Sequence, residues 1–144
     1  MPQIYSRFAI ISSFTLALFL TSCDSETHPV PNVPVNININ LDLPSNQSLN
    51  APGGWIYVNG GSRGIVVYRN FDEFVALDRH CTYHSEDACG VVEVDSVNYF
   101  ELTCPCGSSR YSIMSGVVME GPAKFGLRRY NATWDGAYNV NIYN

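Results

Sequence analysis

Basic residues are scarce in this chain of 144 residues, which has eight Lys and Arg against thirteen Asp and Glu and a formal net charge of −5. Arg7 precedes Cys23, so a chain beginning at Cys23 carries a formal charge of −6. Proteins that bind nucleic acid neutralise its phosphates with clusters of Lys and Arg. The acidic balance therefore excludes nucleic acid as an expected partner and gives no electrostatic attraction to anionic lipid.

The chain also lacks internal repeats, and no segment between residues 35 and 144 has the apolar period of a helix. Residues 35–43 instead alternate apolar side chains with Asn and Asp, which predicts a strand with one apolar face. About 110 residues of short strands predict one all-β domain over 35–144. We expect a loop over 44–54, hairpins over 55–69 and 91–103, and further strands at 74–77, 111–113, 117–119 and 138–142.

No Ser, His and carboxylate have the spacing of a catalytic triad, and nothing places a nucleophile beside a base. Gly60-Gly61 is not a phosphate-binding loop, because no helix follows it to present its N-terminus. We therefore do not expect an enzyme. We expect the nine Tyr and two Trp to fill the core and the cross-strand positions of a β-domain rather than to form a ligand site.

The longest apolar run extends from Phe8 to Leu20, after Arg7. At about 13 residues it is too short to cross a bilayer as a helix, which takes roughly 20, and it has the charged start of a signal peptide. Its end, Leu20-Thr21-Ser22-Cys23, resembles the lipobox of bacterial lipoproteins, in which the cysteine is lipidated and becomes the mature N-terminus. Ordinary cleavage would leave Cys23 as an unpaired thiol.

These features predict a lipoprotein signal peptide over 1–22 and a chain anchored by Cys23 to a membrane of the bacterial cell envelope. Residues 24–34 are largely polar and include three prolines. This composition is typical of an extended, flexible tether, which would join lipidated Cys23 to a domain beginning at residue 35.

The other four cysteines lie in two loops, with Cys81 and Cys89 in the first and Cys104 and Cys106 in the second. The expected hairpin over 91–103 would return the second loop towards the first. The sequence therefore predicts a clamp made of two cysteine loops.

The motifs Cys81-Thr82-Tyr83-His84 with Cys89 and Cys104-Pro105-Cys106-Gly107-Ser108 resemble the two boxes of a Rieske domain, roughly C-x-H-x-x-C and C-P-C-H-G-S. Gly121-Pro122-Ala123, with Leu127 and Tyr130, resembles the proline loop that closes over a Rieske cluster. The resemblance implies an antiparallel β-sandwich with a small two-loop subdomain that binds a 2Fe-2S cluster. It also implies that Cys81 and Cys104 bind one iron and two histidines the other.

The histidine positions are altered. Aligned without gaps, one ligand position falls on Gly107, which has no side chain, and the other falls on Tyr83. His84 follows one residue later and would recover the role only if the loop rearranged. The three remaining candidate ligands for iron are therefore Cys81, His84 and Cys104.

Other pairings of the same residues stay open. The resemblance implies a Cys89–Cys106 disulfide, and without iron Cys81 and Cys104 could close into a second one. Reduction of that pair would give a thiol–disulfide switch. Zinc bound by three cysteines (Cys81, Cys104, Cys106) and His84 is a further alternative, although the cysteine spacings of seven residues and one are not those of zinc knuckles.

Two functions follow as hypotheses. The first is an envelope lipoprotein whose degenerate cluster site is bridged by disulfides and whose role is binding or structural. The alternative is a 2Fe-2S electron carrier that uses Cys81, Cys104 and His84. An unknown envelope protein would be the partner in both cases. His80 and His84 could serve as proton-coupled redox groups or be ordinary loop histidines.

Overall fold

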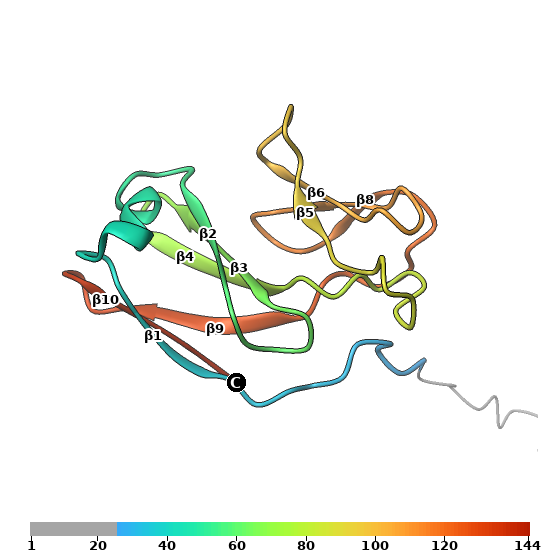
Figure 1. Cartoon of the computed structure of the whole chain (residues 1–144), viewed down its shortest axis with the longest axis horizontal. Coiled ribbons are helices and arrows are strands. Elements are labelled where there is room, and N and C mark those ends of the chain that lie inside the picture. The colour runs from blue at the N-terminus through green and yellow to red at the C-terminus, as the bar shows by residue number, and fades with distance from the viewer. Residues whose placement is uncertain (1–25) are drawn as a thin grey trace, which may run out of the picture.

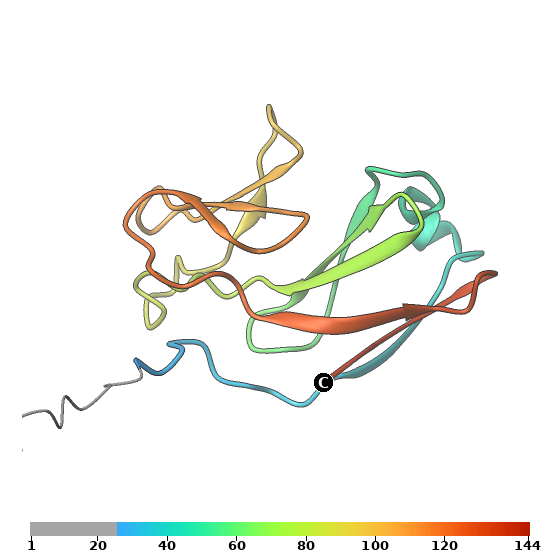
Figure 2. The ribbon, with the colours of Figure 1, turned by 180° about the vertical axis from the view of Figure 1, so that it is seen from behind.

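The computed structural model describes residues 26–144, and the predicted signal peptide and Cys23 lie outside this range. Two antiparallel sheets confirm the all-β prediction: the larger has the order β1-β10-β9-β4-β3-β2 and the smaller β5-β6-β7-β8 (Figures 1 and 2). The elements are β1 (Asn36–Asn40), the 3₁₀ helix η2 (Pro44–Asn50), β2 (Trp55–Val58), β3 (Ile65–Asn70), β4 (Glu73–Asp78), β5 (Glu93–Val94), β6 (Glu101–Thr103), β7 (Arg110–Ser112), β8 (Val118–Glu120), β9 (Arg129–Trp134) and β10 (Asn139–Tyr143).

The hairpin of β3 and β4 forms the centre of the larger sheet and leads directly into the first cysteine loop. Side chains alternate between the faces of a strand, so the paired residues Val66 and Leu77 face the smaller sheet. Their neighbours Val67 and Ala76, also paired, lie on the opposite face. Both faces of this hairpin are buried, and the hairpin fixes the position of the cysteine loops.

Each face contributes to its own apolar cluster. One cluster lies within the curved larger sheet: Val35, Ile39, Leu41, Leu49, Ile65, Val67, Phe74, Ala76, Tyr130, Val140 and Ile142. The other joins the larger sheet to the smaller one and includes two of the cysteines: Val66, Tyr68, Val75, Leu77, Cys81, Val92, Leu102, Cys104, Tyr111, Ile113, Ala123 and Leu127.

The structure differs from the sequence prediction in two elements. Strand β9 was not predicted, although Arg129, Asn131 and Thr133 on its exposed face alternate with Tyr130, Ala132 and Trp134 on the other face. Residues 44–50 form a 3₁₀ helix rather than an open loop, with Pro44 at its first turn and buried Leu49 holding it against the core.

The segment before residue 35, expected to be a tether, lies against the domain (Figure 1). Val30 is fully buried. His28 Nε2 is 3.0 Å from the carbonyl oxygen of Gly126, and Arg128 Nη2 donates to the carbonyl of Val30 at 2.6 Å. The packed domain therefore begins before residue 35. Within the described range no helix has the length and apolar character needed to span a membrane.

Candidate functional site

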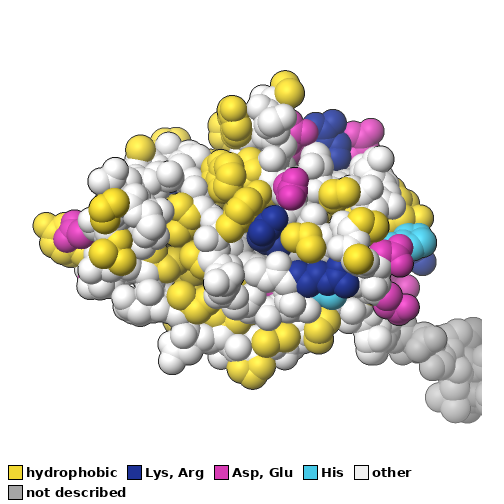
Figure 3. Space-filling view, viewed as in Figure 1, with side chains coloured by type: hydrophobic (Ala, Val, Ile, Leu, Met, Phe, Trp, Pro, Cys, Tyr) yellow, Lys and Arg dark blue, Asp and Glu magenta, His cyan; other side chains and the backbone are white. Residues whose placement is uncertain are grey.

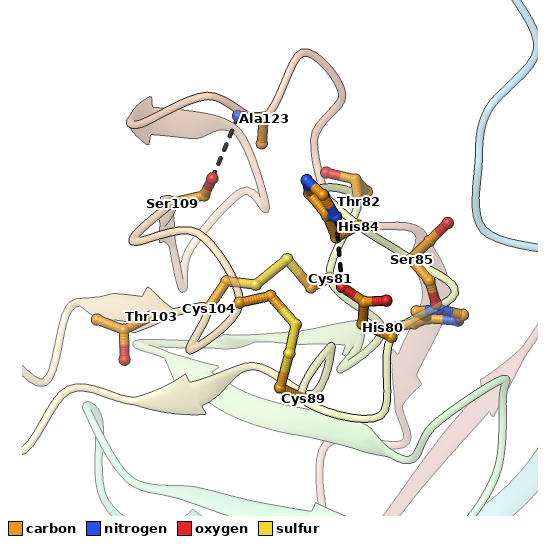
Figure 4. Close-up of a disulfide and its surroundings, with 12 residues drawn as sticks. His80, Cys81, Thr82, His84, Ser85, Cys89, Thr103, Cys104, Ser109 and Ala123 are labelled. Carbon is orange, nitrogen blue, oxygen red and sulfur yellow. Dashed lines mark hydrogen bonds and ion pairs between the residues drawn. A yellow bond between two sulfur atoms is a disulfide. The ribbon is translucent and has the colours of Figure 1, made fainter.

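The two cysteine loops are joined by two disulfides. Cys81 bonds to Cys104 with an S–S distance of 2.08 Å, and Cys89 bonds to Cys106 at 2.06 Å. The two bridges lie side by side where the loops meet (Figure 4). Cys81 and Cys104 are buried, whereas Cys89 is exposed and Cys106 is partly exposed. The predicted clamp therefore has one inner and one outer bridge.

Tyr83 and Gly107, which occupy the two histidine positions of the Rieske boxes, are in direct contact. A Cβ added to Gly107 would lie 2.2 Å from Cδ1 and 2.4 Å from Cε1 of Tyr83. The phenol ring thus fills the space that any side chain at position 107 would need. The φ angle of Gly107 is not positive, so its backbone conformation is open to other residues. Glycine is needed at this position because the ring of Tyr83 leaves no room for a side chain.

His84 is turned towards solvent, with 54% of its side chain exposed, and its Nδ1 lies 3.3 Å from a carboxylate oxygen of Asp87. Its ring packs edge-on against Tyr83. Across residues 26–144, three potential metal ligands come within 4.8 Å of one another in one place only, at Asp87, Cys89 and Cys106. His84 is therefore not assembled with Cys81 and Cys104, nor into the alternative set with three cysteines.

His80 is held in a fixed orientation at the start of the first loop. Its Nε2 donates to the carbonyl oxygen of Ser85 at 2.6 Å (both residues are labelled in Figure 4). Its Nδ1 lies 2.8 Å from Oγ of Ser62. The side chain is buried. Because the carbonyl can only accept, Nε2 carries a proton, and the ring serves to brace the loop.

A buried carboxylate anchors this loop to the sheet. Asp78 accepts hydrogen bonds from the backbone N–H of Ser62 at 2.6 Å and of His80 at 2.8 Å, and from the hydroxyl of Tyr130 at 2.8 Å. A side chain at Gly61 would lie 2.5 Å from this carboxylate, so the turn must carry glycine there. Burial, followed by the hydrogen bond to Asp78, raises the pKa of Tyr130 well above its usual value.

A second buried network lies beside the inner disulfide. The hydroxyl of Thr82 donates to the carbonyl of Phe125 at 2.6 Å, so the Tyr111 hydroxyl, 3.0 Å away, donates to Thr82. The same Tyr111 oxygen lies 3.5 Å from Sγ of Cys81. These bonds tie the first cysteine loop to β7 and to the loop of residues 121–126.

The loop of residues 121–126 closes over the second cysteine loop, as the predicted proline loop should. The backbone N–H of Ala123 donates to Oγ of Ser109 at 3.2 Å, and both residues are buried (Figure 4). A Cβ on Gly121 would lie 2.6 Å from Cα of Ser109, so the two backbones touch at this point. Three loops therefore enclose the inner disulfide.

These residues do not fit a cluster held by two cysteines and two histidines. Both candidate thiolates are in one disulfide, position 107 has no donor atom and is covered by Tyr83, and His84 faces Asp87. Within the described residues the enclosed site offers no nucleophile beside a base, and its exposed groups are the outer disulfide, the Asp87 carboxylate and the His84 imidazole.

Sequence reasoning did not single out Asp78 or Tyr111. An aspartate directly after the apolar segment Phe74–Leu77 was the available signal, since a charge inside a buried strand requires several donors. The role of Tyr111 depends on contacts with Thr82 and Cys81, which lie 29 and 30 positions away in the chain, and no local pattern reveals them.

No family model and no curated protein matches this sequence. The solved structures that are similar in fold include the following three. The cyanobacterial plasma membrane Rieske protein PetC3 from Synechocystis PCC 6803 matches with a TM-score of 0.56 and 22% identity over 75% of this chain and 99% of that chain.

The other two concern carbazole 1,9a-dioxygenase. The ferredoxin of the enzyme from Nocardioides aromaticivorans IC177 has a TM-score of 0.49 and 23% identity, covering 77% of this chain and 97% of its own. The complex of reduced oxygenase and oxidized ferredoxin has a TM-score of 0.48 and 19% identity, covering 81% of this chain and 94% of its own. The two sheets, the paired cysteine loops and the likeness to PetC3 together identify the fold of this chain as that of a Rieske-type domain.

Proposed function

We propose that this protein is a membrane-anchored lipoprotein of the bacterial cell envelope whose Rieske-type domain carries no cluster and has a binding or structural role rather than an enzymatic one. The contact between Tyr83 and Gly107 carries the proposal. A Rieske centre needs two imidazoles on one iron. Here one position has lost its side chain, and the residue at the other position fills the vacated space.

The disulfides support the same conclusion. Cys81 and Cys104 are the positions of the two thiolate ligands, and a bond between them removes both from metal binding. Each bridge contributes about 2–4 kcal/mol by restricting the unfolded chain. The cysteines therefore have a stabilising role that explains their presence without iron, and bridges of this kind persist in an oxidising compartment such as the envelope.

The membrane anchor rests on the lipobox at Leu20–Cys23, and the similar protein PetC3 is described as a plasma membrane protein. Glu26 lies 3.8 Å from Nζ of Lys124, in the loop that closes over the cysteines. Cys23 precedes Glu26 by three positions, a length of chain that can span at most about 10 Å. Lipidated Cys23 would therefore hold the loop of residues 121–126 close to the membrane surface, with an envelope protein as the partner.

Iron and sulfide content, with an absorption spectrum, tests the absence of the cluster. The full-length chain with Cys23→Ser would be exported in one preparation and made under anaerobic, reducing conditions in another. We expect colourless, iron-free protein from both, with no free thiol in the exported form. About two irons and two sulfides per chain, with visible bands, would overturn the proposal and favour the alternative, an electron carrier.

The membrane anchor is tested separately by comparing how the wild-type chain and the Cys23→Ser variant are released from membranes. Wild-type protein should stay with the membrane fraction after a high-salt wash and enter the detergent phase, whereas Cys23→Ser should be soluble. Wild-type protein that washes off in salt would contradict lipidation without bearing on the cluster site.

A further inference from the structure

Strand β1 is a free border of the larger sheet. It pairs with β10 on one side only, in continuous register from Asn36↔Tyr143 to Asn40↔Asn139 (Figure 1). The opposite border, β2, lies beside the smaller sheet, since the hydroxyl of Tyr57 accepts from the N–H of Val94 at 2.9 Å. Among the described elements, none pairs with the outer edge of β1, although the turn at Gly60 lies against the side chain of Ile37.

The sequence of β1, Asn-Ile-Asn-Ile-Asn, has none of the features that protect exposed edges. Natural edge strands carry charged residues, proline or bulges that prevent pairing with another chain. Here no charge lies between Asn36 and Asn40, and the register is unshifted. On the face seen in Figure 3, charged side chains gather over the smaller sheet and the cysteine loops and are nearly absent from the larger sheet.

The backbone of the even-numbered residues points outwards. Leu41 N donates to Tyr138 O at 2.8 Å and Val35 N to Oδ1 of Asn144 at 2.8 Å, so the odd-numbered residues face β10. Backbone groups alternate sides along an antiparallel strand. The N–H and C=O of Asn36 and Asn38 are therefore directed away from the sheet, and residues 26–144 provide them no partner.

Asn40 limits the usable edge. Its outward carbonyl already accepts from Nδ2 of Asn46 at 2.7 Å, so only its N–H is open. Pro34, at the other end, has a carbonyl but no N–H. The edge therefore offers a carbonyl at Pro34, both groups at Asn36 and Asn38, and an N–H at Asn40.

This series of groups is self-complementary. If two copies pair antiparallel about a two-fold axis at Ile37, Asn36 lies opposite Asn38 of the second copy, and each pair exchanges two hydrogen bonds. Asn40 then lies opposite Pro34, where its N–H meets the free carbonyl and no second bond is needed. The inner face becomes continuous through Ile37, which is only partly buried in one copy.

We propose that β1 is a dimerisation edge, through which two copies of this chain join their larger sheets into one. Absence of charge on β1 allows this pairing although each copy is acidic overall. The amide of Asn38 already donates to Oδ1 of Asn141 at 2.7 Å, so the asparagine ladder on the outer face would continue across the two copies.

Sedimentation velocity of the exported full-length Cys23→Ser chain, from low to high micromolar concentration, tests the proposal. We expect a reversible increase in mass from monomer to dimer. In the double variant Asn36→Lys with Asn38→Lys, a lysine of each copy lies opposite a lysine of the other copy at two places in the paired strands. This repulsion should raise the dimer dissociation constant about tenfold or more. Asn131→Lys with Thr133→Lys adds the same charge on the same face of internal strand β9 and should leave dimerisation unchanged.

Mixing gives a second measurement that does not depend on a single variant. Asn36→Glu with Asn38→Glu should also be monomeric, but an equimolar mixture with the lysine double variant should form a dimer, because unlike charges then face each other. A wild-type chain that is monomeric throughout, a dimer lost equally in the β9 control, or a mixture that stays monomeric would each overturn the proposal. Thermal melts of the variants establish that they are folded.

Discussion

The ring of Tyr83 lies directly over Gly107, so that a Cβ on Gly107 would approach Cδ1 of the ring to 2.2 Å. These two residues occupy the histidine positions of the Rieske boxes, and each explains the other. Glycine leaves the space, and tyrosine fills it while packing against the cluster that contains both inner cysteines. Filling the space in this way packs the first cysteine loop against the second.

This contact predicts an energetic coupling between the two positions. Gly107→Ala should destabilise the protein by about 1–3 kcal/mol, because its methyl group overlaps the Tyr83 ring. In a Tyr83→Ala background the same change should cost much less. Urea denaturation of the wild type, both single variants and the double variant measures the coupling. Additive losses would mean that the ring does not depend on the glycine.

The same contact predicts how iron binding could be restored. Gly107→His alone should gain no iron, since the Tyr83 ring occupies the position, whereas Gly107→His with Tyr83→His supplies both imidazoles. We expect more iron per chain in the double variant than in either single one after anaerobic assembly under reducing conditions. Cys104→Ser in the double variant is the control and should abolish the gain. No gain in the double variant would show that the loops have departed from Rieske geometry.

The outer disulfide gives a thermodynamic prediction. Cys89→Ser and Cys106→Ser should each lower the free energy of unfolding by about 2–4 kcal/mol, because either change opens the same bridge. The double variant should cost little more than either single one. Melting temperatures of the three variants measure this, and losses that add would contradict the pairing.

The two bridges should differ in their reactivity. Cys89 is exposed, whereas Cys81 and Cys104 have exposed fractions of 0% and 1%. A thiol reagent must reach the sulfur that it attacks, so under native conditions the Cys89–Cys106 bridge should be reduced first. Timed alkylation followed by peptide mass spectrometry measures the order. Equal rates in folded protein, or earlier labelling of Cys81, would contradict the enclosed position of the inner bridge.

Tyr130 predicts a loss of stability at alkaline pH. Burial and the hydrogen bond to Asp78 raise its pKa in the folded state, so the folded chain retains the proton that the unfolded chain loses above pH about 10. Its contribution to stability is fully present below that pH and is lost as the pH rises towards the folded-state pKa.

Tyr130→Phe removes this contribution and also one donor to Asp78, at a cost of about 1–2 kcal/mol near neutral pH. The advantage of the wild type over this variant should shrink as the pH rises above about 10. Free energies of unfolding from pH 8 to 11 for both chains measure the difference. A constant difference across this range would mean that Tyr130 titrates equally in both states.

Local patterns were enough to predict most of the strands. The alternation in Val35–Leu43 fixed which side chains of β1 are buried, because a period of two permits only one assignment of faces. The glycines of residues 59–64 marked the turn between β2 and β3, because glycine readily adopts the positive φ found at Gly60, Gly61 and Gly64. The motifs around Cys81 and Cys104 also indicated the fold, since their spacing is specific. The helix η2 was missed because Pro, Ser and Asn dominate it, whereas β9 was missed although its residues alternate between polar and apolar.

The sequence alone determined that Tyr83 and Gly107 align with the histidine positions of the Rieske motifs, because the identity of a residue can be read without a structure. Only the tertiary structure decided that the ring of Tyr83 lies over Gly107, because this contact joins residues 24 positions apart. The burial of Asp78 under the turn of residues 61–63 and the free backbone of β1 are likewise non-local. Such features depend on which distant segments of the chain pack together, and local sequence patterns do not predict these tertiary contacts.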